Sequence, residues 1–278
     1  MHAPTWGVLA AESLGLPEVH YEADGVLGDH ATATADFRDQ YYGLDGFLLD
    51  DADLDLETDA RDHRFPPIVT SGLIDLGVCR WESKPARILK RSWHSPRVDR
   101  ARMQSEGSLG SWIDRRLVSK IILATQTRAI EVFVDPEGRY LPGLPLVTVV
   151  PKQSGDLFKV AAALGSPVAS LVGFQRHAGA ALSFRALKLS AKHALQLPYP
   201  VDTSALSDAA SLLREIHNSR DGSQRHALLR AYGAAANEAF NVPRGQSPGL
   251  LAWWLQRVDR AERSATARIR VHHGTASP

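Results

Sequence analysis

Cysteine is almost absent from this chain, which has one, Cys79, among 278 residues. A single cysteine excludes an internal disulfide and, without paired Cys and His residues at zinc spacing, indicates a reducing compartment. Long hydrophobic runs are also lacking, since no segment approaches the roughly 20 apolar residues of a membrane-spanning helix. The first 16 residues contain Glu12 and no basic stretch, unlike a signal peptide. We therefore expect a cytoplasmic protein that contacts no membrane.

Catalytic motifs are equally scarce. The segment Gly107-Ser-Leu-Gly110 lacks the Lys-Ser or Lys-Thr that completes a phosphate-binding loop, and the 11 histidines contain no His-x-x-x-His pair. We expect no metal site and no catalytic residue in this chain. One loose pattern stays open as an alternative: Asp75, Glu82 and Lys84 resemble in spacing the carboxylates and lysine with which metal-dependent nucleases hold Mg²⁺ and polarise water.

The net charge of +1 conceals two oppositely charged stretches. Residues 45–62 contain eight acidic residues and one basic residue, Arg61, which predicts a polyanionic loop. Residues 80–128 contain twelve basic residues against four acidic ones. Such an excess of positive charge is expected where a protein contacts phosphates, although a solvated basic face is the alternative. The tryptophans of this stretch, Trp81, Trp93 and Trp112, favour the nucleic-acid interpretation.

The hydrophobic pattern predicts an α/β (α+β) protein, with a mixed sheet followed by a helical C-terminal region. Strands are expected over 26–35, 68–73, 87–93, 121–125 and 146–150, and helices over 111–118, 160–173, 205–217, 226–240 and 248–263. Ser166-Pro167 predicts a kink or a new helix start inside 160–173. Of the adjacent Trp253 and Trp254, one is expected in the core and the other on a partner surface.

The middle of the chain is the most informative stretch. Lys120-Ile-Ile-Leu-Ala-Thr-Gln-Thr-Arg128 reads as a buried strand that ends in a polar tip. In the following run, Asp135-Pro-Glu-Gly138 predicts a type I turn and hence a hairpin. The tip residues Thr125, Gln126, Thr127 and Arg128 carry the amide, hydroxyl and guanidinium groups that read base edges and contact phosphates.

Four segments in order resemble one protein family. They are Leu27-Gly-Asp29 with Phe37-Arg-Asp-Gln-Tyr-Tyr-Gly43, Val69-Thr-Ser-Gly-Leu-Ile-Asp75, the segment 120–128, and 182–200 ending in Leu197-Pro-Tyr-Pro200. Over residues 25–200 the chain resembles the target-recognition domain of gamma-class, TaqI-like N6-adenine DNA methyltransferases, particularly actinobacterial ones. The resemblance implies organisation into an N-terminal lead (1–24), a recognition domain (25–200), a helical region that docks a partner (201–264) and a disordered tail (265–278).

The catalytic half of that family is not represented in the sequence. The family holds S-adenosylmethionine at a Gly-rich loop and the flipped adenine at an Asn-Pro-Pro-Tyr type motif. Here no Asn-Pro or Asp-Pro-Pro occurs, and about two dozen residues precede the recognition region, too few for a doubly wound domain. The resemblance therefore implies a non-catalytic DNA-recognition subunit of a split methyltransferase, of restriction-modification or phage-defence type. We expect no cofactor in this chain, S-adenosylmethionine in a partner methyltransferase subunit, and double-stranded DNA as ligand.

Two alternatives remain at this stage, a free-standing DNA-binding or regulatory protein derived from such an enzyme and the Mg²⁺-dependent nuclease. Tyr41 and Tyr42 either stack on a splayed base or pack in the core. Residues 176–192 either contact phosphates or decorate a helix surface. The candidate DNA-binding residues are Tyr41, Tyr42, Thr70, Ser71, Lys84, Arg87, Lys90, Arg91, Lys120, Thr125, Gln126, Thr127, Arg128, Arg176, His177, Lys188, Ser190 and Lys192.

Overall fold

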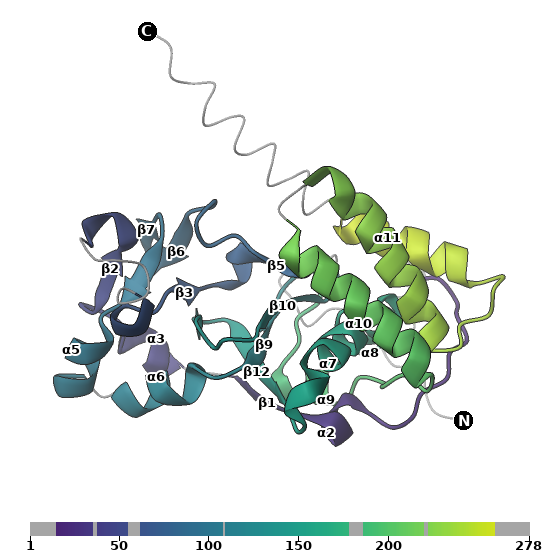
Figure 1. The fold of residues 1–278 in the computed structure, drawn as a ribbon, viewed down its shortest axis with the longest axis horizontal. Helices are drawn as coiled ribbons and strands as arrows, with labels where there is room; N and C mark the ends of the chain where they lie inside the picture. Colours follow the sequence, from purple (N-terminus) through teal and green to yellow (C-terminus); the bar gives the residue numbers. More distant parts are fainter. Residues whose placement is uncertain are drawn as a thin grey trace, which may run out of the picture.

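The protein is an α+β fold in which a mixed set of small sheets and a helical layer enclose one central sheet (Figure 1). The computed structural model describes residues 15–35, 38–54, 62–107, 109–177, 186–219 and 222–258. The strands are β1 (Ala31–Ala35), β2 (Leu48–Asp50), β3 (Ile68–Val69), β4 (Ile74–Asp75), β5 (Val78–Cys79), β6 (Ala86–Ile88), β7 (Arg91–Trp93), β8 (Pro96–Val98), β9 (Lys120–Ala124), β10 (Glu131–Asp135), β11 (Leu141–Pro142) and β12 (Leu146–Pro151).

Helices occupy both flanks of these strands. The α-helices are α2 (Leu27–His30), α3 (Arg38–Tyr42), α5 (Arg100–Ser105), α6 (Gly110–Arg116), α7 (Leu157–Leu164), α8 (Pro167–His177), α9 (Ala191–Leu195), α10 (Thr203–Asn218), α11 (Gly222–Ala239) and a helix over 247–258. Short 3₁₀ turns are η1 (Asp51–Asp53), η2 (Ser71–Leu73) and η3 (Ser154–Asp156).

The central sheet has four antiparallel strands in the order β1-β12-β9-β10. Because side chains alternate along a strand, each strand supplies both faces. Ile121, Leu123 and Val132 belong to one hydrophobic cluster, shared with the helices. Ile122 and Phe133 belong to a second cluster, shared with the small sheets. Burial on both faces explains why β9 and β10 read as nearly continuous apolar runs.

The helical layer packs on the first face. Helix α7 is buried over nearly its whole surface, and α8 begins separately at Pro167 after Ser166, whose Oγ accepts a 3.0 Å bond from Ala169 N. The predicted break at Ser166-Pro167 is thus confirmed as a new helix start. Helix α10 is amphipathic and is capped by Asp202, which accepts bonds from Ser204 N and Ala205 N. The cluster that contains α10 and α11 is continuous with that of α7, α8 and the sheet.

The small-sheet layer packs on the second face. It contains the two-stranded pairs β2–β8, β3–β11, β4–β5 and β6–β7 together with α3, α5 and α6. Trp81 and Trp112 are buried in its core, and Trp93 is partly buried with its Nε1 donating to Ile88 O at 3.2 Å. The structure therefore gives these rings packing roles, which removes them as support for nucleic-acid binding.

Part of the acidic stretch holds this layer together. The buried Arg97 lies 4.7 Å from the Trp81 ring and pairs with Asp51 and Asp62, while Asp62 also pairs with Arg139. Burial opposes ionisation of Asp62, but the two guanidinium groups outweigh it and keep the pKa of this carboxyl below its usual range. Residues 55–61 lie outside the described residues. The described acids of this stretch that bind Arg97 serve packing rather than docking.

The predicted hairpin and three predicted strands differ in detail from the structure. The Asp135–Gly138 turn forms, with Gly138 N donating to Asp135 O, but the following strand β11 pairs with β3 and not with β10. The actual hairpin is β9–β10, and the polar tip is its loop. Residues 87–93 form a hairpin, not one strand, because Leu89 and Lys90 adopt φ of 51° and 64°, as in a type I′ turn. Within the predicted strand 68–73, Ser71–Leu73 form η2, and within the predicted strand 26–35, Leu27–His30 form α2.

The C-terminal helices are confirmed, but the expected exposed tryptophan is not. Trp253 is 7% exposed and Trp254 is fully buried. Neither ring offers a partner surface, because α8 and α11 cover them from different sides: Phe174 meets Trp253 edge-on and Tyr232 contacts Trp254. Within the described ranges, no single helix is long and apolar enough to cross a membrane, and the 154–164 and α8 pair, bent by 61°, reaches that length only together.

One ion pair lies inside the sheet. Lys120 Nζ donates to Asp135 Oδ2 at 2.5 Å between the facing ends of β9 and β10, and both side chains are almost completely buried. Burial lowers the pKa of the Lys120 ammonium, an effect that the Asp135 carboxylate opposes. The same carboxylate accepts bonds from Arg139 N and Tyr140 N, so it also fixes the turn after β10.

Replacement of Lys120 by Met is expected to destabilise the protein by about 3–5 kcal/mol, because it leaves the Asp135 carboxylate buried without its cation. Urea denaturation followed by tryptophan fluorescence measures the loss. The double variant Lys120→Met, Asp135→Asn should recover part of it. A single variant as stable as the parent protein would contradict the assigned role of this pair.

Candidate nucleic-acid interface

The tip of the β9–β10 hairpin is an exposed loop on a rigid support. Gln126 and Arg128 are exposed, and Gln126 adopts φ of 65°, a conformation that non-glycine residues seldom take. The loop is fixed from outside the hairpin, because Thr127 N donates to Leu187 O at 3.2 Å and Leu187 N donates to Thr127 O at 2.7 Å. The backbone that carries the Gln126 and Arg128 side chains is thus held in a fixed position.

A second predicted segment meets the hairpin beside this loop. Ser71 Oγ donates to Pro145 O at 3.0 Å, and Thr125 Oγ1 donates to the same carbonyl at 2.6 Å. Thr125 N donates to Ser71 Oγ at 3.4 Å, and Thr70 precedes η2 at the same place. Thr125 is only 6% exposed. The hydroxyls of Ser71 and Thr125 therefore position the tip rather than present free donors.

The third segment follows Leu187. Lys188 is exposed next to the tip contact, and Lys192 is exposed on α9. Ser190 Oγ accepts a 3.2 Å bond from His193 N and caps α9, so this hydroxyl has a structural role. Arg176 Nη1 donates to Gln196 O at 2.8 Å, and the His177 ring stacks on His193 with centroids 3.8 Å apart. Residues 178–185, which include Ser183, lie outside the described residues.

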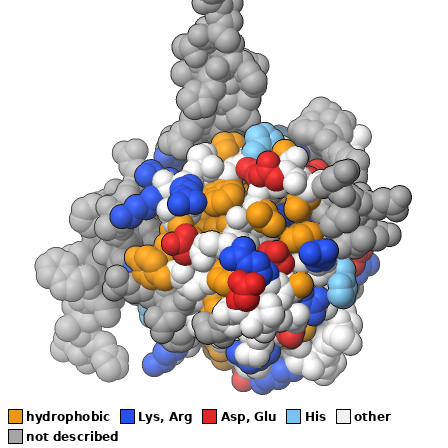
Figure 2. Space-filling model, turned by 90° about the vertical axis from the view of Figure 1, so that its left-hand side faces the viewer, with side chains coloured by type: hydrophobic (Ala, Val, Ile, Leu, Met, Phe, Trp, Pro, Cys, Tyr) orange, Lys and Arg blue, Asp and Glu red, His pale blue; other side chains and the backbone are white. Residues whose placement is uncertain are grey.

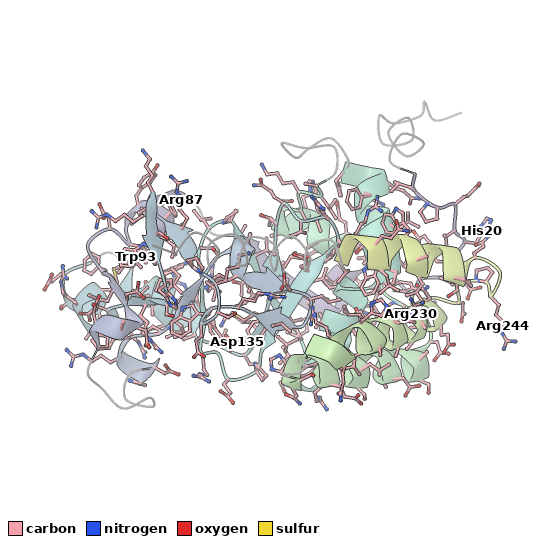
Figure 3. The ribbon with its side chains drawn as sticks, turned by 90° about the horizontal axis from the view of Figure 1, so that it is seen from above. His20, Arg87, Trp93, Asp135, Arg230 and Arg244 are labelled. Carbon is pink, nitrogen blue, oxygen red and sulfur yellow. The ribbon has the colours of Figure 1, made fainter. Side chains whose placement is uncertain are left out.

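Lys84 and the β6–β7 hairpin extend the site. Lys84 Nζ donates to Gly72 O at 2.6 Å, one residue beyond Ser71. The hairpin starts two residues after Lys84 and exposes Arg87, Lys90 and Arg91, for which no ion pair is found among the described residues. Figure 3 shows Arg87 pointing outward at the end of the small-sheet layer.

The two tyrosines divide between the roles considered for them. Tyr41 is partly buried, and its hydroxyl accepts a 2.8 Å bond from Leu89 N, so it holds the β6–β7 turn. Tyr42 is 55% exposed and meets Tyr41 edge-on at 5.4 Å. Of the two rings, Tyr42 is the one with a surface exposed for stacking on a base.

The basic stretch is less continuous than its sequence suggests. Arg80 pairs with Asp75, Arg100 with Asp114 and Arg102 with Glu106. Figure 2, which faces the outer end of the small-sheet layer, shows Lys and Arg side chains in separate groups between acidic and hydrophobic ones. The predicted DNA contact by Lys120 is wrong, because its ammonium is fully buried against Asp135. Within residues 80–128, the basic residues that are exposed without an ion pair among the described residues are Arg87, Lys90, Arg91, Arg115 and Arg128, and Lys188 adds a charge beside the tip.

The nuclease alternative gains no support from the geometry. Asp75 is engaged by Arg80, Lys84 by the Gly72 carbonyl, and Glu82 is exposed. In the part of the chain that the structure describes, no group of three or more His, Cys, Asp or Glu side chains converges on a possible metal position.

Glu131 is a site residue that sequence reasoning missed. It pairs in register with Ala124 at the tip end of β10 and is 6% exposed. Burial, followed by the nearby Asp75 carboxylate, raises the pKa of Glu131 to about 8, against the opposing charges of Arg225, Lys84 and Arg80. Glu131, Phe133 and Asp135 lie on the same face of β10, since side chains alternate along a strand. A second buried layer covers this face, so at neutral pH the site contains a largely protonated carboxyl group.

Replacing Glu131 by Gln should change how stability depends on pH. The carboxyl of the unfolded chain loses its proton near its ordinary pKa of 4.5, whereas the folded one holds it to about pH 8. Stability from this group is therefore lost as pH rises through that interval. Urea denaturation between pH 5 and 9 should find Glu131→Gln equal to the parent at the acid end and increasingly more stable above it. Glu137→Gln, at a 73% exposed position, is the matched control. Parallel curves for parent and Glu131→Gln would contradict the buried carboxyl.

The sequence comparisons do not assign a function to this site. No family model matches the chain, and no curated protein sequence matches it. The residues that meet at the tip of the β9–β10 hairpin are the features of this site that bear on function.

Proposed function

We propose that this protein is the DNA-recognition subunit of a split N6-adenine DNA methyltransferase. The supporting observation is convergence: segments around residues 71, 84, 126 and 188, separated along the chain, meet at one end of the central sheet. Three of the four segments that resemble the TaqI-like recognition domain contribute to this end. Base edges are read by amide and guanidinium groups held on a firm support, which describes Gln126 and Arg128.

The residues of the site would have three different roles. Gln126 and Arg128 read bases, Tyr42 offers a stacking surface, and Lys84, Arg87, Lys90, Arg91 and Lys188 hold phosphates. Ser71, Thr125, Thr127 and Ser190 position the others through side-chain bonds to the main chain, and Thr70 precedes η2 at the same place. The sequence contains no motif for S-adenosylmethionine or for a flipped adenine, so a separate methyltransferase subunit would supply both.

Docking of that subunit would use a polar surface. Among the described residues, the exposed large hydrophobic side chains are Val26, Tyr42 and Val118, none of them on the C-terminal helices. The outward sides of α10 and α11 carry exposed charged residues such as Asp208, Glu215 and Arg230. Polar interfaces of this kind are typical of subunits that also exist apart. Copurification from the native host, with adenine methylation mapped with and without this gene, tests the partnership; unchanged methylation favours the free-standing regulator.

Phosphate binding predicts a change in salt dependence. Replacing Arg87, Lys90 and Arg91 by Ala, with Lys84→Ala made separately because it also binds Gly72 O, should flatten the plot of log affinity against log salt by about 0.9 for each phosphate that is no longer neutralised. Binding to duplex DNA at several salt concentrations measures the slope. A variant with Lys152, Arg230 and Arg244 changed to Ala removes the same number of positive charges and is the control for total charge. If the control flattens the slope equally, the DNA lies elsewhere.

Base reading predicts a different response at the tip. Gln126→Ala or Arg128→Ala should remove about 1–3 kcal/mol of discrimination between the preferred site and its variants, while affinity for random DNA changes little. Competition binding against a site library, with the methyltransferase subunit present, measures both quantities. Gln153→Ala, an exposed glutamine beyond the opposite end of β12, is the matched control. An unchanged preferred site and margin in both tip variants would make the tip structural.

A further inference from the structure

A cavity of about 800 Å³ lies at the end of the central sheet opposite the hairpin tip. It opens between the small-sheet layer and the helical layer, near Asp135, which Figure 3 places between the two layers. Strand β5, the turn after β10, the first turn of α7 and the end of α10 line it. The DNA interface proposed above does not use this cavity, and its volume suits a small ligand.

One wall is aromatic. The Phe133 ring meets Tyr140 edge-on with centroids 5.4 Å apart, and the His217 ring lies 5.4 Å from Phe133 and 5.8 Å from Phe158. Phe133 and Phe158 are nearly buried, whereas Tyr140 and His217 are partly open to the cavity. Burial lowers the pKa of His217, so its ring is neutral at neutral pH. A planar ligand ring would find flat apolar surface here.

The rim carries guanidinium groups. Arg214 lies one turn before Asn218 on α10, with its guanidinium 4.5 Å from the Phe158 ring centroid, and no ion pair with it is found among the described residues. Arg139 lies on the turn after β10, and its guanidinium already forms an ion pair with Asp62. A guanidinium held over a ring and open to solvent is suited to a phosphate.

The acids and the thiol of the cavity do not repel such a ligand. The Asp135 carboxylate is occupied by Lys120 and two backbone N–H groups, and the Glu137 carboxylate at the rim lies 3.8 Å from Arg139 Nη1, whose positive charge offsets it. Burial raises the pKa of Cys79 to about 12, so its thiol stays protonated. The charge that a ligand meets at this rim is therefore the positive charge of Arg214, which favours an anion over a cation.

Polar groups at the end of α10 favour one orientation. The last carbonyls of a helix have no partner within it and accept hydrogen bonds, and the cavity is also lined by the exposed Asn218 at the end of α10 and by Ser83. The amino group of a base would donate to these carbonyls, and a ring nitrogen of the base would accept from Asn218 or Ser83. The phosphate would then lie one helical turn earlier on α10, beside Arg214. From the aromatic wall, the open guanidinium and these edges, we propose that the cavity binds a nucleoside phosphate, with its base against Tyr140 and His217 and its phosphate beside Arg214.

The test titrates the full chain with AMP, adenosine and S-adenosylmethionine, by calorimetry and ligand-detected NMR. AMP should bind more tightly than either other compound, because only AMP carries a phosphate at the 5′ position, where S-adenosylmethionine carries a sulfonium cation and adenosine a neutral hydroxyl. Arg214→Gln should weaken AMP binding about tenfold, the usual effect of losing a charge-assisted hydrogen bond, and should leave adenosine binding unchanged. His217→Leu should weaken AMP and adenosine alike, since both use the ring.

Arg230→Gln is the matched control, because Arg230 is exposed on α11 in the same layer and does not line the cavity. Thermal denaturation confirms that each variant folds. No binding of AMP at millimolar concentration, adenosine binding as tight as AMP, or an equal effect of Arg230→Gln would each overturn the proposal. Because Gln126 and Arg128 lie at the other end of the sheet, their variants should bind AMP normally, so failure here leaves DNA recognition untouched.

Discussion

The structure depends on a four-stranded sheet that is buried on both faces. One face packs on helices that come mainly after it in the chain, and the other on small sheets that come mainly before it. A strand in this position has no side that can tolerate unpaired charge, so an ionisable residue within it must be paired or neutral. Lys120 and Asp135 satisfy each other at one end, and Glu131 is held in its protonated form at the other. The ends of the strands remain the places where polar groups reach water.

This constraint explains why two distinct sites are separated by the length of β9 and β10. At one end the chain passes through Gln126 and Arg128, supported by Ser71, Pro145 and Leu187. At the other end the turn after Asp135 and the end of α10 leave a cavity between the layers. The sheet core between them, from Ile121 to Leu123 on one strand and Val132 to Val134 on the other, has almost no exposure to solvent. Each site can therefore be altered with little effect on the other.

The sequence was a good guide wherever one periodicity dominated. Strands β9 and β12, the break at Ser166-Pro167 and the C-terminal helices were predicted because apolar runs and helical spacing are local signals. Pairing was harder, since β11 joins β3 across more than 70 residues and no local pattern encodes that choice. Charge was misleading for the same reason: Arg97 and Lys120 look like surface cations until distant carboxylates are brought to them. Among the candidate site residues, Lys120 lies in the central sheet and is buried, whereas Arg87, Lys90 and Arg91 lie on the outer β6–β7 hairpin and stay exposed.

The anchoring of the hairpin tip also limits how this protein can diversify. Ala124 and Glu131 are register partners, and Thr127 is fastened to Leu187, so the loop has little freedom in length. Gln126 and Arg128 are the tip residues whose side chains extend outward without a structural bond among those described. Under the proposed function, relatives with other target sites would differ at these two positions while keeping the loop length. The hairpin would then act as a fixed holder with two exchangeable side chains, and new specificities would arise by substitution rather than by insertion.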